Sequence, residues 1–422
     1  MPSSTLPLLT LLRGGNVFAP AALGKIDVLI AGGRIAAMGA QLPAPPVGWP
    51  CVVIELDGAI VIPGLIDAHV HLSGGGGEAG PETKVPPLAL TALTTAGVTS
   101  VVGLLGTDAS TRHPRELLAA ARAMQRLGLS AWMWTGAYPV PTPTITGSVQ
   151  GDIVSCEQVI GAGEIAISDH RSAQPTFDEL ARLAAECHVG GLLAGKAGVL
   201  HLHLGDGKRG LELVRRLLDE TEIPARVLQP THLNRNPTLW REAMALAERG
   251  VPIDITAFPP DDDDAALPAH IAVGQWLDAG LTSERLTISS DGGGCLPVWD
   301  ADGAMVRMDV GSSHSLLATL SALVNAGRDL TTVLPLMTRN VARNLKLKGK
   351  GVLEVGADAD LVVLAQPAGA RENPGSTAFA ARDVMAGGVW MVQGGVAMVR
   401  GPLERSQGGS SRNEPQSGAA KW

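Results

Sequence analysis

Aromatic residues and cysteines are scarce in this chain of 422 residues. Only 3% of the residues are aromatic, and a single tyrosine is present, so aliphatic side chains must fill most of the interior. The four cysteines include no Cys-x-x-Cys pair, and they are too few for a disulfide framework in a chain of this length. We therefore expect a protein of a reducing compartment and predict a cytoplasmic location.

Long apolar runs and an excess of positive charge are also missing. No apolar run approaches the roughly 18 residues that a membrane span needs, and the apolar N-terminal stretch shows neither a preceding basic region nor a small-residue cleavage site. The 33 Lys and Arg residues face 41 Asp and Glu residues, for a net charge of −8, and this balance disfavours binding to nucleic acid. With 45% hydrophobic residues, the chain should be globular, with neither membrane nor nucleic acid among its partners.

Both ends of the chain are rich in short segments typical of β-strands. Near the N-terminus these segments flank the turn signals Ala31–Gly33 and Asp57-Gly58, and near the C-terminus they flank Gln393–Gly395. We predict that residues 1–62 and 345–402 form one small, sandwich-like β domain. The polar, Gly- and Ser-rich stretch 403–422 predicts a disordered tail.

The middle of the chain, residues 63–344, alternates between two kinds of segment. Short runs rich in Val, Ile and Leu are followed by stretches of helical period, such as Arg115–Leu127 and Thr176–Cys187. Repeated strand-then-helix units indicate a parallel sheet. The length of this region suits a single (β/α)8 barrel of the TIM type, and we therefore assign the chain to the α/β class.

Two histidines, His69 and His71, end an apolar run and precede the glycine-rich stretch Gly74–Gly77. Residues two apart on a strand project to the same face, so both imidazoles point the same way. At the C-terminal end of a barrel strand this face lines the active site, where paired imidazoles are natural ligands for Zn²⁺ or a similar metal. A pair of hydrogen-bonded structural histidines would show the same spacing, so this motif alone leaves both interpretations open.

Further candidate ligands stand at the ends of later apolar runs. A (β/α)8 unit averages roughly 30 residues, so the spacing of these candidates places the whole set on barrel strands 1, 4, 5, 6 and 8. Side chains at the C-terminal ends of those strands converge, and four imidazoles with two carboxylates suffice for two divalent metals about 3.5–4 Å apart. We therefore predict a two-metal site formed by His69, His71, Glu164, His203, His232 and Asp291.

These residues and the motifs around them resemble the amidohydrolase superfamily and, more narrowly, the bacterial isoaspartyl dipeptidases. The resemblance runs over nearly the whole chain to about residue 400. The shared stretches are His69–Leu72, Gly74–Pro81, Ala96–Asp108, Thr135–Tyr138, Ile167–Ser172, Pro230–His232 with Asn234–Asn236, and Ser289–Gly292. Motifs of this length are highly specific.

The resemblance implies a metal-dependent barrel hydrolase with a flanking β domain, assembled as a homo-oligomer. It also implies two metals, usually zinc, and cleavage of the β-linked peptide bond in dipeptides such as β-Asp-Xaa. The chemistry of the residues supports this reaction independently: a hydroxide bridging two metals is a strong nucleophile near neutral pH, and Asp291 could take its proton and pass it to the leaving amine. By resemblance, Tyr138 assists the oxyanion; without it, a lone tyrosine could equally cap the edge of the core.

A zwitterionic dipeptide needs a pocket with one fixed anion and at least one fixed cation. Glu78, on the glycine-rich loop, is the candidate for the α-ammonium group of the substrate. Arg171 and Arg235, shortly after predicted strands 4 and 6, are candidates for bidentate carboxylate binding. Most arginines are solvated surface charges, so the motif matches carry these two assignments. The resemblance adds Thr107 as a further hydrogen-bonding residue.

Two residues depart from the pattern of the family. Glu164 stands where relatives carry a lysine that is carboxylated to bridge the metals, and Cys295 stands where they carry a serine that contacts substrate. Glutamate supplies the same charge on a shorter side chain, so either its strand lies closer to the metals or it binds one metal only; we favour bridging. A thiol is a weaker hydrogen-bonding group than a hydroxyl. His201 matches no ligand of the family, and we interpret it as a supporting or core residue.

Two other functions compete with this hypothesis. A different amidohydrolase acting on cyclic amides or N-acyl amino acids would share the metal site, and a non-catalytic assembly module would have lost its ligands. All the ligand positions hold competent residues here, which argues against the module. The acidic run Asp261–Asp264 is interpreted as a solvated loop, with a preference for substrates whose second residue is basic as the sharper alternative.

Overall fold

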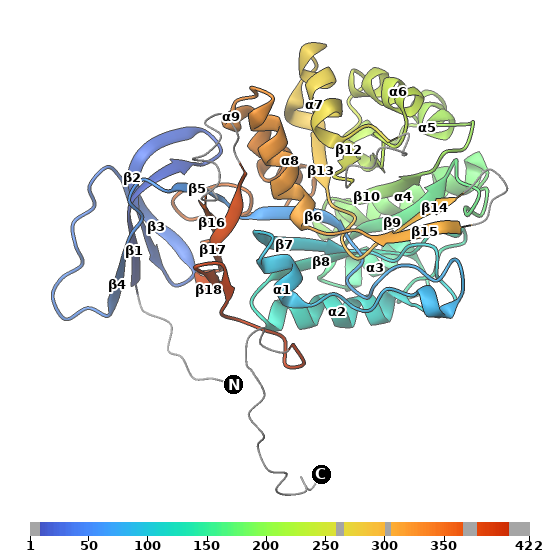
Figure 1. Ribbon diagram of the computed structural model, residues 1–422. Helices are drawn as coiled ribbons and strands as arrows, with labels where there is room; N and C mark the ends of the chain where they lie inside the picture. The colour runs from blue at the N-terminus through green and yellow to red at the C-terminus, as the bar shows by residue number, and fades with distance from the viewer. Residues whose placement is uncertain (1–8, 259–265, 300–304, 366–377, 405–422) are drawn as a thin grey trace, which may run out of the picture.

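The computed structural model describes residues 9–258, 266–299, 305–365 and 378–404, and its main body is a β/α barrel (Figure 1). One sheet of six strands runs parallel and in chain order, and two further strands form a parallel pair. These strands are β6 (Leu65–Val70), β7 (Val98–Gly103), β8 (Ser130–Thr135), β9 (Val159–Ile167), β10 (Val199–Leu204), β11 (Leu228–Thr231), β12 (Ile253–Thr256) and β13 (Leu286–Ser289). The predicted α/β class and barrel are confirmed.

The barrel closes through contacts outside the regular ladders. β12 lies beside β11, and β13 lies beside β6. At the second junction Val70 and Gly292 form a parallel bridge, and the backbone N–H of His71 donates to the carbonyl oxygen of Gly292 at 2.8 Å. The first and eighth barrel strands therefore meet at the point where two predicted metal ligands, His71 and Asp291, leave them.

Side-chain caps mark the start of several helices of the barrel. Thr176 and Glu179 form a capping box at the start of α4 (Phe177–Ala194), and Gly195 ends this helix in the left-handed conformation, with φ 66°. The other helices are α1 (Leu90–Thr94), α2 (Pro114–Arg126), α3 (Val149–Ser155), α5 (Glu212–Glu220), α6 (Pro237–Ala247), α7 (Ala269–Asp278), α8 (His314–Asn325), α9 (Leu330–Val333) and α10 (Arg339–Asn344). Among the described residues, none of the helices has the length and apolar character needed to cross a bilayer.

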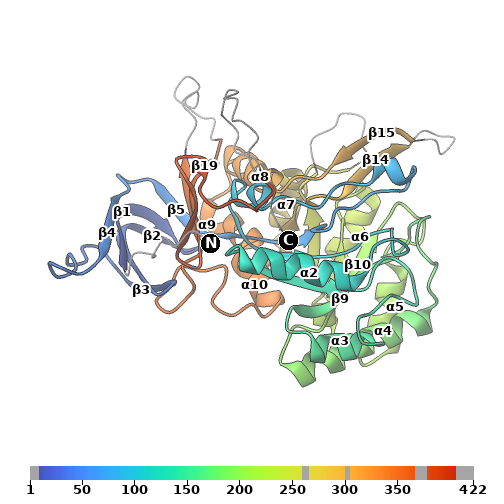
Figure 2. The ribbon, with the colours of Figure 1, turned by 90° about the horizontal axis from the view of Figure 1, so that it is seen from below.

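Strands from both ends of the chain form a second, nine-stranded sheet beside the barrel (Figure 2). Its order is β19-β18-β17-β16-β5-β1-β2-β3, with β4 also paired to β1. Its strands are β1 (Leu9–Phe18), β2 (Ala22–Ala31), β3 (Arg34–Gly39), β4 (Cys51–Glu55), β5 (Ile60–Pro63), β16 (Leu361–Ala365), β17 (Ala380–Ala386), β18 (Val389–Gln393) and β19 (Val396–Ala397). The sheet has a small core of its own, which includes Leu12, Val28, Val61, Leu361 and Met385.

The predicted turns of this sheet behave in two ways. Gly32-Gly33 joins β2 and β3 as an antiparallel hairpin, and Gly394-Gly395 does the same for β18 and β19. Asp57-Gly58 does not reverse the chain, because β4 and β5 both pair parallel to β1, at Leu9–Arg13 and at Asn16-Val17. This turn therefore offsets two strands that follow one another along β1.

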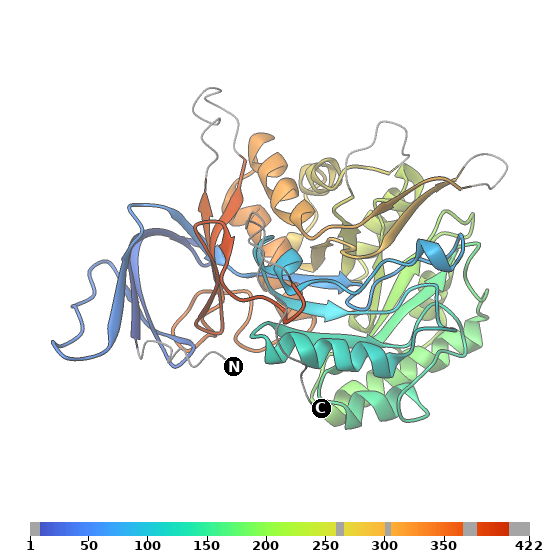
Figure 3. The ribbon, with the colours of Figure 1, turned by 60° about the horizontal axis from the view of Figure 1, so that its bottom comes forward.

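One hairpin extends from the barrel on the side away from the small sheet (Figure 3). It consists of β14 (Cys295–Trp299) and β15 (Met305–Val310), which pair antiparallel directly after the eighth barrel strand. The acidic run Asp261–Asp264 and the predicted tail beyond residue 404 lie outside the described residues.

Candidate metal centre

The predicted ligands come from the strands that their spacing indicated. His69 lies on β6, and His71 directly follows it; Glu164 lies on β9 and His203 on β10. His232 directly follows β11, and Asp291 comes two residues after β13. These are the first, fourth, fifth, sixth and eighth barrel strands, and the side chains of all six residues are buried.

Glu164 lies at the middle of the cluster. Its Oε2 is 3.0 Å from Nδ1 of His203 and 3.5 Å from Nε2 of both His69 and His232. Its Oε1 is 3.6 Å from Nε2 of His71. The carboxylate therefore faces imidazoles from three different strands or strand ends.

Asp291 closes the cluster on the side of the first strand. Its Oδ1 lies 3.4 Å from Nε2 of His69 and 3.1 Å from Nε2 of His71. Three overlapping groups of potential ligand atoms result, and each is compact enough to hold one ion: His69, His232 and Asp291; His69, His71 and Glu164; and Glu164, His203 and His232. Glu164 belongs to two of these groups.

Unpaired atoms in the cluster fit a metal. Nε2 of His69 and Oδ1 of Asp291 are buried, and neither has a hydrogen-bond partner within the part of the chain that the structure describes. A buried polar atom without a partner costs free energy, which a bound cation would remove. Neutral imidazoles and carboxylates are also the donor set of zinc and related divalent metals.

The electrostatics of the cluster keep both carboxylates charged. Burial acts to raise the pKa of Glu164 and of Asp291, but the neighbouring histidines outweigh it and hold both pKa values well below the ordinary range. Burial acts to lower the pKa of His69, but the charges of Glu164 and Asp291 raise it to about 9. Burial lowers the pKa of His232 to about 3, against its hydrogen bond with Glu164. The cluster thus combines two ionised carboxylates with His69, whose raised pKa reflects the negative charge around it.

Two of the ligands have an unusual backbone conformation. His232 has φ 60° and Asp291 has φ 56°, values in the left-handed region that side chains other than glycine rarely adopt. Such strain persists only where the surrounding structure enforces it, and it concentrates at functional sites. Here it occurs one residue after the end of β11 and two residues after the end of β13, where the side chains turn toward the cluster.

His201, two residues before His203 on β10, supports the cluster through a contact with His69. Its Nε2 lies 2.9 Å from Nδ1 of His69, and its ring stacks on Trp134 with centroids 5.1 Å apart. Burial holds the pKa of His201 well below its usual value, so this imidazole is neutral and can accept the Nδ1 proton of His69. The contact directs Nε2 of His69 at Glu164 and Asp291, as expected for a residue that orients a metal ligand.

Three of the predicted substrate-binding residues meet beside the cluster. The hydroxyl of Thr107 donates to Oε1 of Glu78 at 2.8 Å, and Nη1 of Arg171 lies 3.5 Å from the same oxygen. Only 9% of the Glu78 side chain and 14% of the Arg171 side chain are exposed. A fixed anion and a fixed cation are therefore held side by side in a shielded position.

Tyr138 touches the cluster through its hydroxyl. Its Oη lies 2.8 Å from Nδ1 of His203. Burial and the charge of Glu164 raise the pKa of Tyr138 well above its ordinary value, so the hydroxyl keeps its proton and remains a donor. The guanidinium of Arg171 lies 5.5 Å from the centre of the tyrosine ring.

Arg235 and Cys295 lie close enough to the site to act electrostatically on its residues or to be acted on by them. They make different contacts. Nε of Arg235 donates to the carbonyl oxygen of Leu204 at 2.9 Å, and its charge acts on Tyr138. Cys295 begins β14 and is half-buried. Burial and the charge of Glu78 raise the pKa of its thiol to about 12, so it remains a protonated thiol.

Two contributing residues were not predicted from the sequence. The carboxylate of Asp169 accepts hydrogen bonds from Arg171 at 2.8 Å and lies 2.9 Å from Nε2 of His203. Arg112 donates to the carbonyl oxygens of Ser73 and Val85, and so joins the two ends of the loop that carries Glu78. Asp169 stands in the quoted motif two residues before Arg171, which was the available signal.

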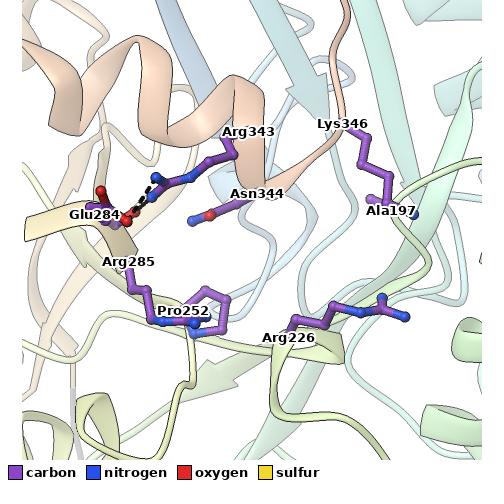
Figure 4. A pocket seen from close by; sticks show the side chains of 8 residues that line it. All are labelled: Ala197, Arg226, Pro252, Glu284, Arg285, Arg343, Asn344 and Lys346. Atoms are coloured by element: carbon purple, nitrogen blue, oxygen red, sulfur yellow. Dashed lines mark hydrogen bonds and ion pairs between the residues drawn. The ribbon is translucent and has the colours of Figure 1, made fainter.

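A cavity of about 320 Å³ (Figure 4) lies at the end of the barrel opposite the cluster, near the starts of β10, β11, β12 and β13. Its lining residues are Ala197, Arg226, Pro252, Glu284, Arg285, Arg343, Asn344 and Lys346. Arg343 pairs with Glu284 at 3.1 Å, and Arg285 and Lys346 donate to backbone carbonyls. The lining includes none of the predicted ligands or substrate-binding residues.

Comparisons with known proteins agree with this geometry. Residues 60–391 match the amidohydrolase family. A solved structure of β-aspartyl dipeptidase from Fervidobacterium islandicum AW-1, in complex with the dipeptide β-Asp-Leu, is 38% identical, covers 93% of this chain and 98% of its own, and superposes with a TM-score of 0.86.

Two further matches carry names of other activities. Allantoinase from Rubrobacter xylanophilus is 27% identical over 412 residues, which cover 85% of this chain and 84% of that protein. Adenine deaminase from Paracoccus denitrificans is 43% identical over only 67 residues. That stretch spans 15% of this chain and 11% of the length of the deaminase.

Proposed function

Because this chain belongs to the amidohydrolase family, we propose that it is a metal-dependent dipeptidase that hydrolyses the β-peptide bond of isoaspartyl dipeptides, β-Asp-Xaa. One observation carries the proposal: Glu78 and Arg171 form an anion–cation pair beside the ligand cluster, in a chain 38% identical over 93% of its length to a β-aspartyl dipeptidase. Allantoinase, a hydrolase of another kind, is a weaker match at 27% identity.

The proposed centre holds two divalent ions, with zinc favoured by its nitrogen-rich donor set. His69, His71 and Asp291 would hold one ion, and His203 and His232 the other. Glu164 would be shared, since its Oε1 faces His71 and its Oε2 faces His203 and His232. Bound divalent ions supply Lewis-acid chemistry, which lowers the pKa of water and polarises the amide carbonyl.

Residues of the chain accept, transfer and donate the protons of the reaction. Asp291 is ionised and buried, so it can accept the proton of the attacking water and later pass it to the leaving amine. Tyr138, whose hydroxyl keeps its proton, donates a hydrogen bond to the oxygen that becomes negative during attack. The hydrogen bonds between Arg171 and Asp169 hold the guanidinium of Arg171 in place beside Tyr138.

The pair of Glu78 and Arg171 explains selection for the β linkage. In a β-linked dipeptide the free α-ammonium and α-carboxylate groups share one carbon atom, so they need an anion and a cation side by side. Oε1 of Glu78 and Nη1 of Arg171, 3.5 Å apart, match that arrangement. An α-linked dipeptide has spent its α-carboxyl group in the peptide bond. Arg235 would bind the carboxylate of the second residue, and Cys295 and Thr107 would border the site.

Hydrolysis of β-Asp-Leu beside α-Asp-Leu by the purified full chain tests the proposal. We expect cleavage of the β-linked peptide only, lost after chelation and restored by Zn²⁺. Cleavage that survives complete metal removal would contradict it. A metal-loaded protein that cleaves neither peptide would also contradict it, and activity on dihydroorotate, hydantoins or N-acyl amino acids would then identify the other kind of amidohydrolase.

Assembly and location form a further part of the proposal. The family resemblance favours a homo-oligomer, and the cysteine content favours the cytoplasm. Light scattering coupled to size-exclusion chromatography measures the first, and a monomer at micromolar concentration would contradict it.

A further inference from the structure

Strand β9 carries one residue more than its neighbour β10 at the level of the metal centre. Leu200 pairs with Ala162, and Leu202 pairs with Ile165, with a shift of register between them. Two residues of β9, Gly163 and Glu164, therefore stand opposite a single residue of β10, which is a β-bulge. On its other side β9 pairs with β8 only as far as Ala162, so the bulge follows the last pair of that ladder.

The bulge requires glycine at its first position because β10 lies so close. A Cβ atom on Gly163 would stand 2.7 Å from Cβ of His201 and 2.8 Å from its carbonyl oxygen. His201 cannot easily move away, since it is fully buried, stacks on Trp134 and lies 2.9 Å from His69. The backbone of β9 is thus pressed against a fixed neighbour just before Glu164.

The side chain of Glu164 is short for the distance to the four histidines that surround its carboxylate. Its short side chain must bring one carboxylate within 3.0 to 3.6 Å of His203, His232, His69 and His71, which are carried by β6, β10 and β11 or lie directly after them. In a regular strand the position of a side chain is fixed by the pleat, whereas a bulge bends the strand and re-aims the residue at its centre.

We propose that Gly163, through this one-residue bulge, is the positioning residue that brings the short carboxylate of Glu164 to the place shared by both metals. The inference rests on the proposed two-metal centre. The proposal links Gly163 to the glutamate at position 164. Because the bulge moves the backbone toward the metals, the side chain of Glu164 can reach them without an added carboxyl group. On the bulged strand, a longer side chain at position 164 would extend beyond the position that both metals share.

Lysine provides a probe of this reach. Its Nζ amine can attack CO₂, forming a nitrogen–carbon bond and releasing one proton to solvent. The product is an anionic carboxylate on a longer side chain. In a strand without the bulge this longer acid should fit, and in the bulged strand it should not.

The test uses four full-length proteins: wild type, deletion of Gly163, Glu164→Lys, and the deletion combined with Glu164→Lys. Each is stripped with chelator and reloaded with Zn²⁺, with or without bicarbonate. Bound zinc per chain is measured by elemental analysis, zinc affinity by titration, and folding of the metal-free protein by circular dichroism. Glu157→Lys, an exposed change of the same kind just before β9, is the matched control and should bind zinc like wild type.

Wild type should bind two ions with or without bicarbonate. Deletion of Gly163 should weaken zinc binding by roughly 10–100-fold, as loss of a supporting contact does at metal sites. The combined variant should regain zinc only with bicarbonate, and Glu164→Lys alone should not regain it.

Two results would overturn the inference while leaving the centre intact: wild-type zinc binding after deletion of Gly163, or full rescue of Glu164→Lys by bicarbonate with the bulge present. The second decides the question even where the deletion variant does not fold, because that substitution leaves the backbone unaltered. A wild-type protein that binds fewer than two ions would instead contradict the proposed centre, and the inference would fall with it.

Discussion

Oδ2 of Asp169 lies 2.9 Å from Nε2 of His203, and the same oxygen accepts a hydrogen bond from Nη2 of Arg171 at 2.8 Å. One carboxylate therefore orients a proposed metal ligand and a proposed substrate-binding cation together. Burial acts to raise its pKa, but its hydrogen bonds with His203 and Arg171 lower the pKa well below the ordinary value. Asp169 is thus a charged group throughout the neutral range.

Asp169→Asn should damage both functions while preserving shape. We expect zinc affinity to fall by roughly 10–100-fold, the usual effect of losing a partner of a metal-ligating histidine, and KM for β-Asp-Leu to rise as Arg171 loses its carboxylate. Zinc titration and steady-state kinetics measure the two effects. Asp219→Asn, at an exposed carboxylate 2.6 Å from Arg249, is the control and should change neither value much; unchanged zinc affinity in Asp169→Asn would count against the orienting role.

Tyr138→Phe should slow the chemical step and leave the metals in place. The substitution removes the hydroxyl that lies 2.8 Å from His203 and that we assign to the oxyanion. Loss of one such donor costs roughly 10²–10³-fold in kcat. Zinc content by elemental analysis should stay at the wild-type value. A variant whose entire loss of activity tracks a loss of zinc would show that the hydroxyl serves the centre rather than the reaction.

Glu78→Gln should weaken recognition of the α-ammonium group. A hydrogen bond to a charged group contributes about 1.5–3 kcal/mol, so kcat/KM for β-Asp-Leu should fall by roughly 10–150-fold. Glu82→Gln changes an exposed residue of the same loop and should have little effect. Equal losses in the two variants would mean that the charge of the loop matters, and not the position of Glu78.

Zinc affinity should rise with pH in the neutral and mildly alkaline range. The pKa of His69 in the metal-free protein is raised to about 9, so below that pH a cation must displace a proton from this ligand. One displaced proton gives about a tenfold gain in affinity per pH unit up to about pH 9, and no further gain from His69 above it. His232, with its pKa lowered to about 3, contributes nothing in this range. Competition titrations at several pH values measure the slope, and a flat line from about pH 7 to about pH 9 would contradict the assignment.

Periodic features of the chain were predictable from the sequence. The alternation of apolar and helical segments gave the barrel, because each strand and helix buries one side through a local pattern. The spacing of His69, Glu164, His203, His232 and Asp291 indicated the strands that carry them. Parallel strands in chain order bring their C-terminal ends to one face, so counting repeats was sufficient.

Features that depend on lateral contacts between strands were not predictable. The extra residue at Gly163 appears only when β9 is laid beside β10, and Asp57-Gly58 resembles a hairpin turn until β4 and β5 are both seen to pair with β1. The link from Asp169 to His203 likewise joins the segment after β9 to β10 through side chains whose rotamers no local pattern encodes. Sequence motifs name such residues without revealing what they touch.

The small sheet has a consequence for the order in which the protein can form. β5 pairs on one side with β1 and on the other with β16, and β16 emerges only after all the barrel strands have been synthesised. Until then β5 presents an open edge, of the kind that promotes association between chains. β5 also leads through Gly64 directly into β6, the first barrel strand. The ladder from Val61–Pro63 to Leu361–Val363 therefore pairs the segment that precedes the barrel with a segment that follows it. These pairs join segments from the two ends of the chain, so they carry a large loop-closure cost, and the edge of β5 stays open until they form.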